Sequence, residues 1–245
     1  MSSDVNANSI KNSSVITSGD FYRGCNSSAI MQAANFPDDL LSFLQLESLV
    51  ILQIAREQRC DTLVEFGCYD GRALEIAKLL EIRYLGVDIN EKAIKTLNRR
   101  IANEGLRGSA RSIVADINNP AQWSSHIDGN STLYVIPFNL IGNLSKPRSI
   151  LNILKERGGY GVLSVFNADP WTTEIRRNYY TACGIGMLGT EPAPFGGVKF
   201  CGAGGFVSQS FSHHGFEQFL TECNVTTLST NKNRIAQCVA VKFTS

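Results

Sequence analysis

The 245-residue sequence contains no apolar run near the roughly 20 residues that a membrane-spanning helix needs. No apolar segment follows Lys11 as it would in a secretory signal peptide. These two absences predict a protein of the cytoplasm that has no membrane partner.

Charge of one sign is also lacking. The 23 Lys and Arg residues nearly balance the 22 Asp and Glu residues, for a net charge of +1. Binding to nucleic acid needs a clustered basic surface that neutralises phosphates, so this balance argues against a nucleic-acid partner.

Metal-binding patterns are missing as well. The seven cysteines include no C-x-x-C pair, and their odd number and irregular spacing favour free thiols in a reducing compartment. Cys183, Cys201, His213 and His214 do not have a spacing that is known for zinc ligands. We therefore expect no metal site.

Hydrophobic residues make up 43% of the chain, which is enough to build a sizeable core. Residues 1–20 are rich in Ser and Asn and predict a flexible tail. Residues 21–59 predict a helical lid whose main helix starts near Pro37 and ends near Arg59. Residues 60–245 then form the main domain.

In that domain, short apolar runs alternate with amphipathic helical patterns. Strands are predicted at 62–66, 84–87, 112–114, 132–136 and 160–165, and helices at 72–80, 91–103, from Pro120, at 147–156, 171–183 and 213–223. This order is typical of an α/β, Rossmann-like parallel sheet with helices on both faces. The Gly- and Pro-rich segment 184–205 predicts a long substrate loop or irregular hairpin, followed by a strand at 206–211. Residues 225–228 and 236–243 predict a closing strand pair.

A glycine turn after the first strand carries the strongest functional signal. Glu65, Gly67 and Gly71 lie directly before a helix, and Asp88 ends the second strand. Enzymes that bind a nicotinamide dinucleotide or another adenosine-containing cofactor use this layout, with the acid on ribose hydroxyls. The nicotinamide class requires G-x-G-x-x-G, which is absent here, and Glu65 would repel a pyrophosphate.

At this point the chain resembles the class I S-adenosylmethionine-dependent methyltransferases. Glu65, Gly67 and Gly71 match the family motif E/D-x-G-x-G-x-G, whereas Tyr69 departs from it. The resemblance implies S-adenosylmethionine as cofactor and a seven-stranded sheet whose last strand is antiparallel. It places Asp88 on the ribose, and Asp116 with Ile117 near the adenine. The further cofactor-binding candidates are Cys68, Ile89, Pro137 and, from the N-terminal segment, Tyr22.

The end of the fourth strand is the candidate methyl-transfer edge. The Asn139 carbonyl could accept a hydrogen bond from a substrate N–H, and the Phe138 ring could hold a cation. Asn143 is a further substrate-binding candidate. Both asparagines could instead be turn formers that bond to nearby backbone.

His213 and His214, at a strand-to-helix junction, are candidate general bases. In the alternative interpretation, one histidine caps the helix and the other is exposed. Trp171, Tyr179 and Tyr180 are candidates for the wall of the substrate pocket, although aromatic residues are also ordinary core residues.

The sequence thus predicts methyl transfer from S-adenosylmethionine to a small molecule by in-line displacement. Nitrogen is slightly favoured over oxygen or carbon as the acceptor atom, and a homodimer is compatible with the sequence. Three alternatives stay open: a nicotinamide-dependent oxidoreductase, a non-catalytic interaction subunit that keeps the fold, and a methyltransferase of macromolecules.

Overall fold

The computed structural model describes residues 18–127 and 129–244. The predicted tail at 1–20 therefore lies mostly outside the described residues. Its last three positions are not tail-like, because Ser18–Arg23 form helix α1. The short helices η1 (Cys25–Met31) and η2 (Ala33–Asn35) follow. The longest helix, α2 (Asp38–Glu57), begins after Pro37, which occupies the N-cap position with extended backbone angles.

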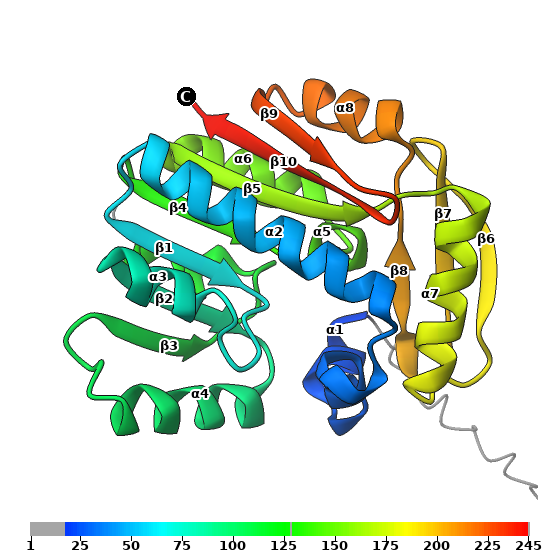
Figure 1. Ribbon diagram of the computed structural model, residues 1–245, viewed down its shortest axis with the longest axis horizontal. Coiled ribbons are helices and arrows are strands. Elements are labelled where there is room, and N and C mark those ends of the chain that lie inside the picture. Colours follow the sequence, from blue (N-terminus) through cyan, green and yellow to red (C-terminus); the bar gives the residue numbers. More distant parts are fainter. Residues whose placement is uncertain (1–17, 128, 245) are drawn as a thin grey trace, which may run out of the picture.

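A seven-stranded sheet forms the centre of the molecule, in the order β3-β2-β1-β4-β5-β10-β9 (Figure 1). Its strands are β1 (Thr62–Phe66), β2 (Arg83–Asp88), β3 (Ala110–Val114), β4 (Thr132–Ile136), β5 (Gly159–Phe166), β9 (Thr226–Lys232) and β10 (Ala236–Phe243). The first five pair in parallel, whereas β10 runs antiparallel to both β5 and β9. The predicted fold class is confirmed.

Helices cover both faces of this sheet. One face carries α2, α3 (Leu74–Leu80) and α4 (Glu91–Asn103), and the other carries α6 (Pro147–Arg157) and α8 (His213–Glu222). The side chains of a strand alternate between the two faces. Leu63 and Leu133 accordingly pack in the cluster under α2 to α4, while Val64 and Tyr134 pack in the cluster under α6 and α8.

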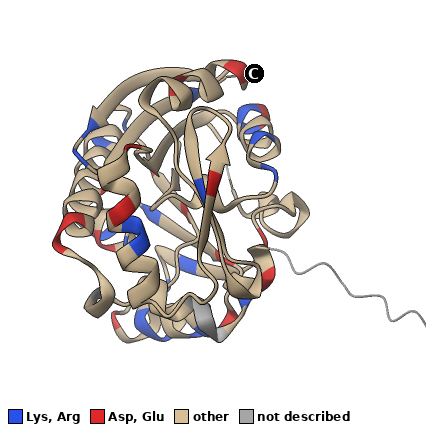
Figure 2. Ribbon diagram, turned by 90° about the vertical axis from the view of Figure 1, so that its right-hand side faces the viewer, with Lys and Arg blue, Asp and Glu red and all other residues tan. Residues whose placement is uncertain are grey.

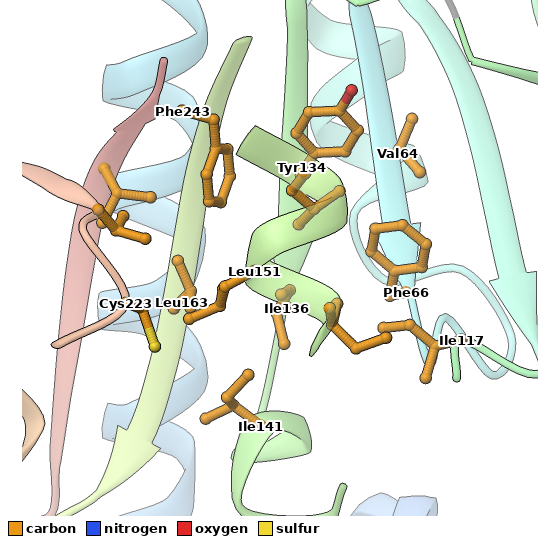
Figure 3. Close-up of a cluster of buried hydrophobic side chains, with 14 of the residues drawn as sticks. Val64, Phe66, Ile117, Tyr134, Ile136, Ile141, Leu151, Leu163, Cys223 and Phe243 are labelled. Atoms are coloured by element: carbon orange, nitrogen blue, oxygen red, sulfur yellow. The ribbon is translucent and has the colours of Figure 1, made fainter. Parts of the chain in front are cut away.

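Figure 3 shows the second of these clusters, in which aromatic rings cross several strands of the sheet. The rings of Phe66 and Tyr134 are stacked with 6.4 Å between their centroids, and Tyr134 meets Phe243 edge-on at 5.9 Å. Leu151 from α6 lies over the same surface. Close packing across β1, β4 and β10 fixes the relative positions of the strand ends, where the polar residues lie.

The Gly- and Pro-rich segment contains a hairpin, which is one of the two structures that the sequence predicts for it. It forms two strands of a second sheet, β6 (Gly189–Ala193) and β7 (Gly197–Cys201), which pair antiparallel. After the short helix η5 (Ala203–Gly205), strand β8 (Val207–Gln209) completes this sheet beside β7. Helix α7 (Pro170–Ala182) precedes it. In Figure 1 the arrowheads of the parallel strands point toward α1 and this second layer.

The helix predicted from Pro120 is also corrected. Two short helical turns, η3 (Pro120–Gln122) and η4 (Ser124–His126), stand in its place, and α5 (Leu140–Asn143) follows β4. None of the described helices is long and apolar enough to cross a membrane. Lys and Arg residues are interspersed with Asp and Glu on the side that carries α7 and the second sheet (Figure 2).

Candidate functional site

A cavity of about 320 Å³ opens where the parallel strands end. Its wall comes from the turn after β1, the ends of β2 to β5, the N-terminal segment 18–31, α7 and β8. We call the part lined by Gly67, Tyr69, Asp88, Ile89, Asp116 and Ile117 the β1–β3 end. The part lined by Phe166, Tyr179, Tyr180 and Ser208 is the α7–β8 end. The carboxyl edge of a parallel sheet is the usual ligand-binding edge of such folds.

The turn after β1 has left-handed backbone angles at three alternate positions. Gly67 has φ +62°, Tyr69 φ +48° and Gly71 φ +83°. Tyr69 thus takes the backbone conformation that a glycine would take at its position, although this costs a side chain free energy. Gly71 has a second requirement, because a Cβ there would lie 2.7 Å from a Leu97 methyl carbon. Gly67 and Tyr69 line the cavity, and Gly71 shapes the turn behind it.

Asp88 lines the cavity at the end of β2 and is held by backbone N–H groups. Its two carboxylate oxygens accept hydrogen bonds from Tyr69 N at 2.8 Å and from Asn90 N at 2.7 Å. Burial raises the pKa of Asp88 above its usual range, although these backbone bonds counteract the increase. Asn90 caps α4 as expected, accepting from Ala93 N at 3.1 Å. A carboxylate held in this way points in a fixed direction.

Asp116, which follows β3, also lines the cavity. Its carboxylate accepts from Arg23 Nη2 of α1 at 3.1 Å, and from the backbone and side chain of Asn118 at 2.9 and 3.0 Å. Asn90 Nδ2 donates to the Tyr22 carbonyl at 3.4 Å. Polar contacts therefore join α1 to the β1–β3 end, and Tyr22, the candidate from the N-terminal segment, lines the cavity.

Glu65 requires a correction, because it does not line this cavity. It is 1% exposed and accepts from Tyr84 Oη at 2.7 Å and Ala73 N at 3.1 Å. Strand alternation directs its side chain toward α3, away from the strand ends. Burial raises the pKa of Glu65 to about 7. Cys68 is buried behind the same turn and does not line the cavity either.

Arg72 lines the cavity and was missed at the sequence level, although a cation directly after the second glycine was a visible signal. Its Nη2 bonds to Glu47 Oε1 at 3.2 Å, and its guanidinium lies 5.2 Å from the Phe138 ring centroid. Its Nη1 is buried and has no hydrogen-bond partner among the described residues. This arrangement leaves a fixed cationic donor at the cavity wall.

Glu47 connects Arg72 with the end of β4. While Oε1 binds Arg72, Oε2 accepts from Phe138 N at 2.7 Å and from the Ser164 hydroxyl. Phe138 and Asn139 have φ values of +46° and +63° in succession. Such consecutive left-handed residues are strained and concentrate at functional sites. Pro137, Phe138 and Asn139 all line the cavity.

The predicted free carbonyl of Asn139 is not found. Asn139 is 1% exposed, and its Oδ1 accepts from Phe166 N at 3.2 Å. Its Nδ2 donates to Ser208 Oγ and to the Gln209 carbonyl, both at 3.0 Å. Its carboxamide therefore joins the turn after β4 to β5 and β8, which are distant in the sequence, and does not bond to nearby backbone as the turn-forming alternative suggested. Asn143 also lines the cavity, and its buried Oδ1 has no partner among the described residues.

Tyr179 and Tyr180, two candidates for the wall of the substrate pocket, line the α7–β8 end of the cavity. The Tyr179 hydroxyl donates to the Ile30 carbonyl of the N-terminal segment, and burial raises the pKa of Tyr179. Trp171 does not line the cavity, because it lies about two helical turns from Tyr179. The Arg234 guanidinium is 3.7 Å from the ring centroid of Trp171.

The two candidate bases are not at the cavity. His213 and His214 begin α8 with exposed side chains, and His214 makes only a 3.7 Å contact with Glu217. The helix is capped by Ser212, which accepts from Gly215 N at 3.0 Å. The described residues that line the cavity include no histidine. No group of three potential metal-binding side chains occurs within 18–127 and 129–244.

Comparison with known proteins identifies the fold class of this chain. No protein-family model and no curated protein matches the sequence. The structure is similar to the 1,6-didemethyltoxoflavin-N1-methyltransferase of Burkholderia thailandensis, with TM-score 0.59, 13% identity, and coverage of 90% of this chain and 87% of that chain.

Two further solved structures are similar. One is a SAM-dependent methyltransferase of Methanosarcina mazei, with TM-score 0.53, 19% identity, and coverage of 76% of this chain and 93% of that chain. The other is the glycopeptide N-methyltransferase MtfA, with TM-score 0.52, 11% identity, and coverage of 80% and 95%. The chain thus has the fold of the class I S-adenosylmethionine-dependent methyltransferases.

Proposed function

We propose that this protein transfers a methyl group from S-adenosylmethionine to a small acceptor molecule. The observation that carries the proposal is the β1–β3 end of the cavity. There a left-handed turn and the residues Asp88 and Asp116 line one space. Arg72 lines the same cavity, and its Nη1 has no partner among the described residues. The structure of the Burkholderia enzyme, which has a similar fold, contains S-adenosylhomocysteine.

The residues present fit this cofactor. Each Asp88 oxygen accepts one backbone hydrogen bond and keeps a lone pair for a ribose hydroxyl. Asp116 and Ile117 supply an acceptor and an apolar wall for adenine. The free Nη1 of Arg72 would bind the methionyl carboxylate, since arginine is suited to carboxylates. Glu65 faces elsewhere, so the carboxylates left for the cofactor are those of Asp88 and Asp116.

A bound sulfonium supplies an already activated methyl group. The chain therefore has to align the acceptor and exclude water, which are effects of positioning. Residues of the segment 18–31 and the two tyrosines of α7 line the cavity, and its size suits a small molecule rather than a polymer. We place this activity in the cytoplasm, with a biosynthetic role.

Nitrogen is the acceptor atom that we favour. The buried Oδ1 of Asn143 lacks a donor among the described residues, and an acceptor N–H would supply one. It takes the role that the sequence suggested for Asn139. Two of the similar structures are N-methyltransferases by name, which supports the same choice.

Calorimetric titration tests the cofactor. We expect micromolar binding of S-adenosylmethionine and S-adenosylhomocysteine, and no binding of NAD or NADP. Binding of the nicotinamide pair alone would support the oxidoreductase alternative. If none of the four ligands binds, the proposed function is wrong. That result would favour the alternative of a non-catalytic interaction subunit.

A variant sharpens the assignment of Arg72. Arg72→Gln should weaken S-adenosylhomocysteine binding at least tenfold, because a charge-assisted bond to the carboxylate is lost. Methylthioadenosine, which lacks the amino acid part, serves as the matched control ligand. Its affinity should stay within twofold. An equal loss for both ligands would show that Arg72 acts on the turn and not on the carboxylate.

A further inference from the structure

Behind Ser208, at the α7–β8 end of the cavity, lies a buried cation that the methyl-transfer chemistry described above does not use. Arg176 of α7 is 0% exposed, and the described residues provide it with no carboxylate partner. Its guanidinium donates to the carbonyls of Val198 and Ser208 at 3.3 and 2.7 Å. It also lies 4.8 to 5.7 Å from the ring centroids of Phe166, Tyr180 and Phe200.

A buried arginine keeps its charge, and charges are seldom fully buried without an opposite charge. Carbonyl dipoles and ring faces compensate it only in part, and its Nε has no partner in the described chain. The positive potential therefore extends to the neighbouring wall of the cavity. The only acidic residues among the described lining residues, Asp88 and Asp116, belong to the opposite β1–β3 end.

Ser208 connects this cation to the cavity. Its Oγ lies 3.0 Å from Asn139 Nδ2 and 3.3 Å from Arg176 Nη2, and both are N–H donors. The orientation of the Asn139 amide is fixed, because its oxygen faces Phe166 N and its nitrogen faces the Gln209 carbonyl. A hydroxyl has two lone pairs and one hydrogen, so both lone pairs of Ser208 are used.

The remaining contact of Ser208 is with Tyr180 Oη, at 2.8 Å. Because Ser208 has only its hydrogen left, it must donate, and Tyr180 must accept. The Tyr180 proton is then available, and none of the described residues accepts it. Tyr180 lines the cavity, so this proton is available to a bound molecule. Successive hydrogen bonds that start at a cation polarise one another, which strengthens the final donor.

We propose that the methyl acceptor is an acid bound as its anion, with a negatively charged oxygen or ring nitrogen that receives the hydrogen bond from Tyr180. The proposal rests on the proposed function, because only that function makes the bound acid a methyl acceptor. The anion site itself needs no cofactor. Carboxylates, enolates and deprotonated heterocycles belong to this class. Where the anionic atom is itself the one that is methylated, it has no proton to lose and needs no general base, which agrees with the exposed positions of His213 and His214.

The test uses para-nitrophenol, whose absorption spectrum distinguishes the phenol from the phenolate. We expect the wild-type protein to bind the phenolate at least tenfold more tightly than the phenol, because Tyr180 donates a charge-assisted bond. Tyr180→Phe should abolish most of this preference. Ser208→Ala keeps the tyrosine but removes the donor that orients it, so an intermediate preference is expected.

Tyr179→Phe is the matched control. The adjacent tyrosine lines the same cavity, but its proton is already donated to the Ile30 carbonyl. The preference for phenolate should therefore remain in this variant. Failure of the wild type to bind phenolate preferentially would overturn the proposal, as would a larger loss in Tyr179→Phe than in Tyr180→Phe.

The outcome is separable from that of the proposed function. Titration of Tyr180→Phe with S-adenosylhomocysteine should give wild-type affinity, since Tyr180 lies at the other end of the cavity. If the wild type binds no S-adenosylhomocysteine but still prefers phenolate, the methyltransferase assignment fails and the anion site stands. The reverse result would remove the anion site alone.

Discussion

The two ends of the cavity are held in place by different kinds of hydrogen bond. The β1–β3 end consists of strand ends and a turn, and its key acid is held by backbone N–H groups of nearby residues. The α7–β8 end consists of side chains from β4, α7 and β8 that bond to one another over 28 to 70 residues of sequence. A backbone scaffold tolerates substitution around it, whereas a side-chain network depends on every member.

The largest effect on stability is expected at Glu47, because its carboxylate bonds to both Arg72 and Phe138 N. Glu47→Ala should lower the free energy of unfolding by about 3 kcal/mol, since it removes one partner of a buried ion pair. Urea unfolding measures this effect. Glu57→Ala is the control, because Glu57 is exposed on the same helix, and should cost less than about 0.5 kcal/mol. Equal costs would show that the bonds of Glu47 to Arg72 and Phe138 do not stabilise the fold.

Glu65 tests whether the motif acid supports the turn rather than binding a ligand. Its pKa is about 7 in the folded protein, above the ordinary value of 4.5, mainly because of burial. The unfolded state therefore loses this proton first, and stability falls as pH rises from about 4.5 to 7, by at most about 1.4 kcal/mol per pH unit. Thermal unfolding of Glu65→Gln, compared with wild type across this range, should lack that decline. Parallel profiles would contradict the assignment.

Asp88 tests the β1–β3 end directly. Asp88→Ala should weaken binding of S-adenosylhomocysteine by about 1.5–3 kcal/mol, because charge-assisted bonds to the ribose are lost. Calorimetry measures the change, and Asp88→Asn should recover part of it. An affinity equal to that of wild type would mean that the ribose lies elsewhere.

The smallest effect is expected for the two histidines. His213→Ala and His214→Ala should each leave the turnover of an identified acceptor within twofold of wild type, since both side chains are exposed outside the cavity. A loss of tenfold or more in either variant would restore the general-base hypothesis and contradict a deprotonated acceptor.

The β1–β3 end could be predicted from the sequence because its signals are local. Apolar runs define the strands, and Asp88 and Asp116 follow them directly. Strand alternation explains the one misplaced acid, since Glu65 shares its face with Leu63. This alternation of side chains along a strand could be inferred from the sequence, and it could have excluded Glu65 from the cavity.

The α7–β8 end could not be predicted in the same way. Arg176 reads as one more charged residue of an amphipathic helix, and only the fold brings it beside Ser208. The glycines of 184–205 suggested a long loop or an irregular hairpin, and in the hairpin that forms, some of them serve close packing. At Gly197, for example, a Cβ would lie 2.1 Å from the Ser210 carbonyl oxygen. Glycine composition alone does not distinguish freedom of the backbone from lack of space.

The contact between Arg23 and Asp116 has a consequence for ligand exchange. An adenine amino group and the Arg23 guanidinium would donate to the same carboxylate, so they would compete for it. Binding of the cofactor would then be coupled to displacement of α1 from that carboxylate. The Arg23 side chain is 51% exposed, so dissolved salt screens its attraction to Asp116. Ionic strength would thus set how readily the cofactor enters and leaves, without altering any step of the chemistry.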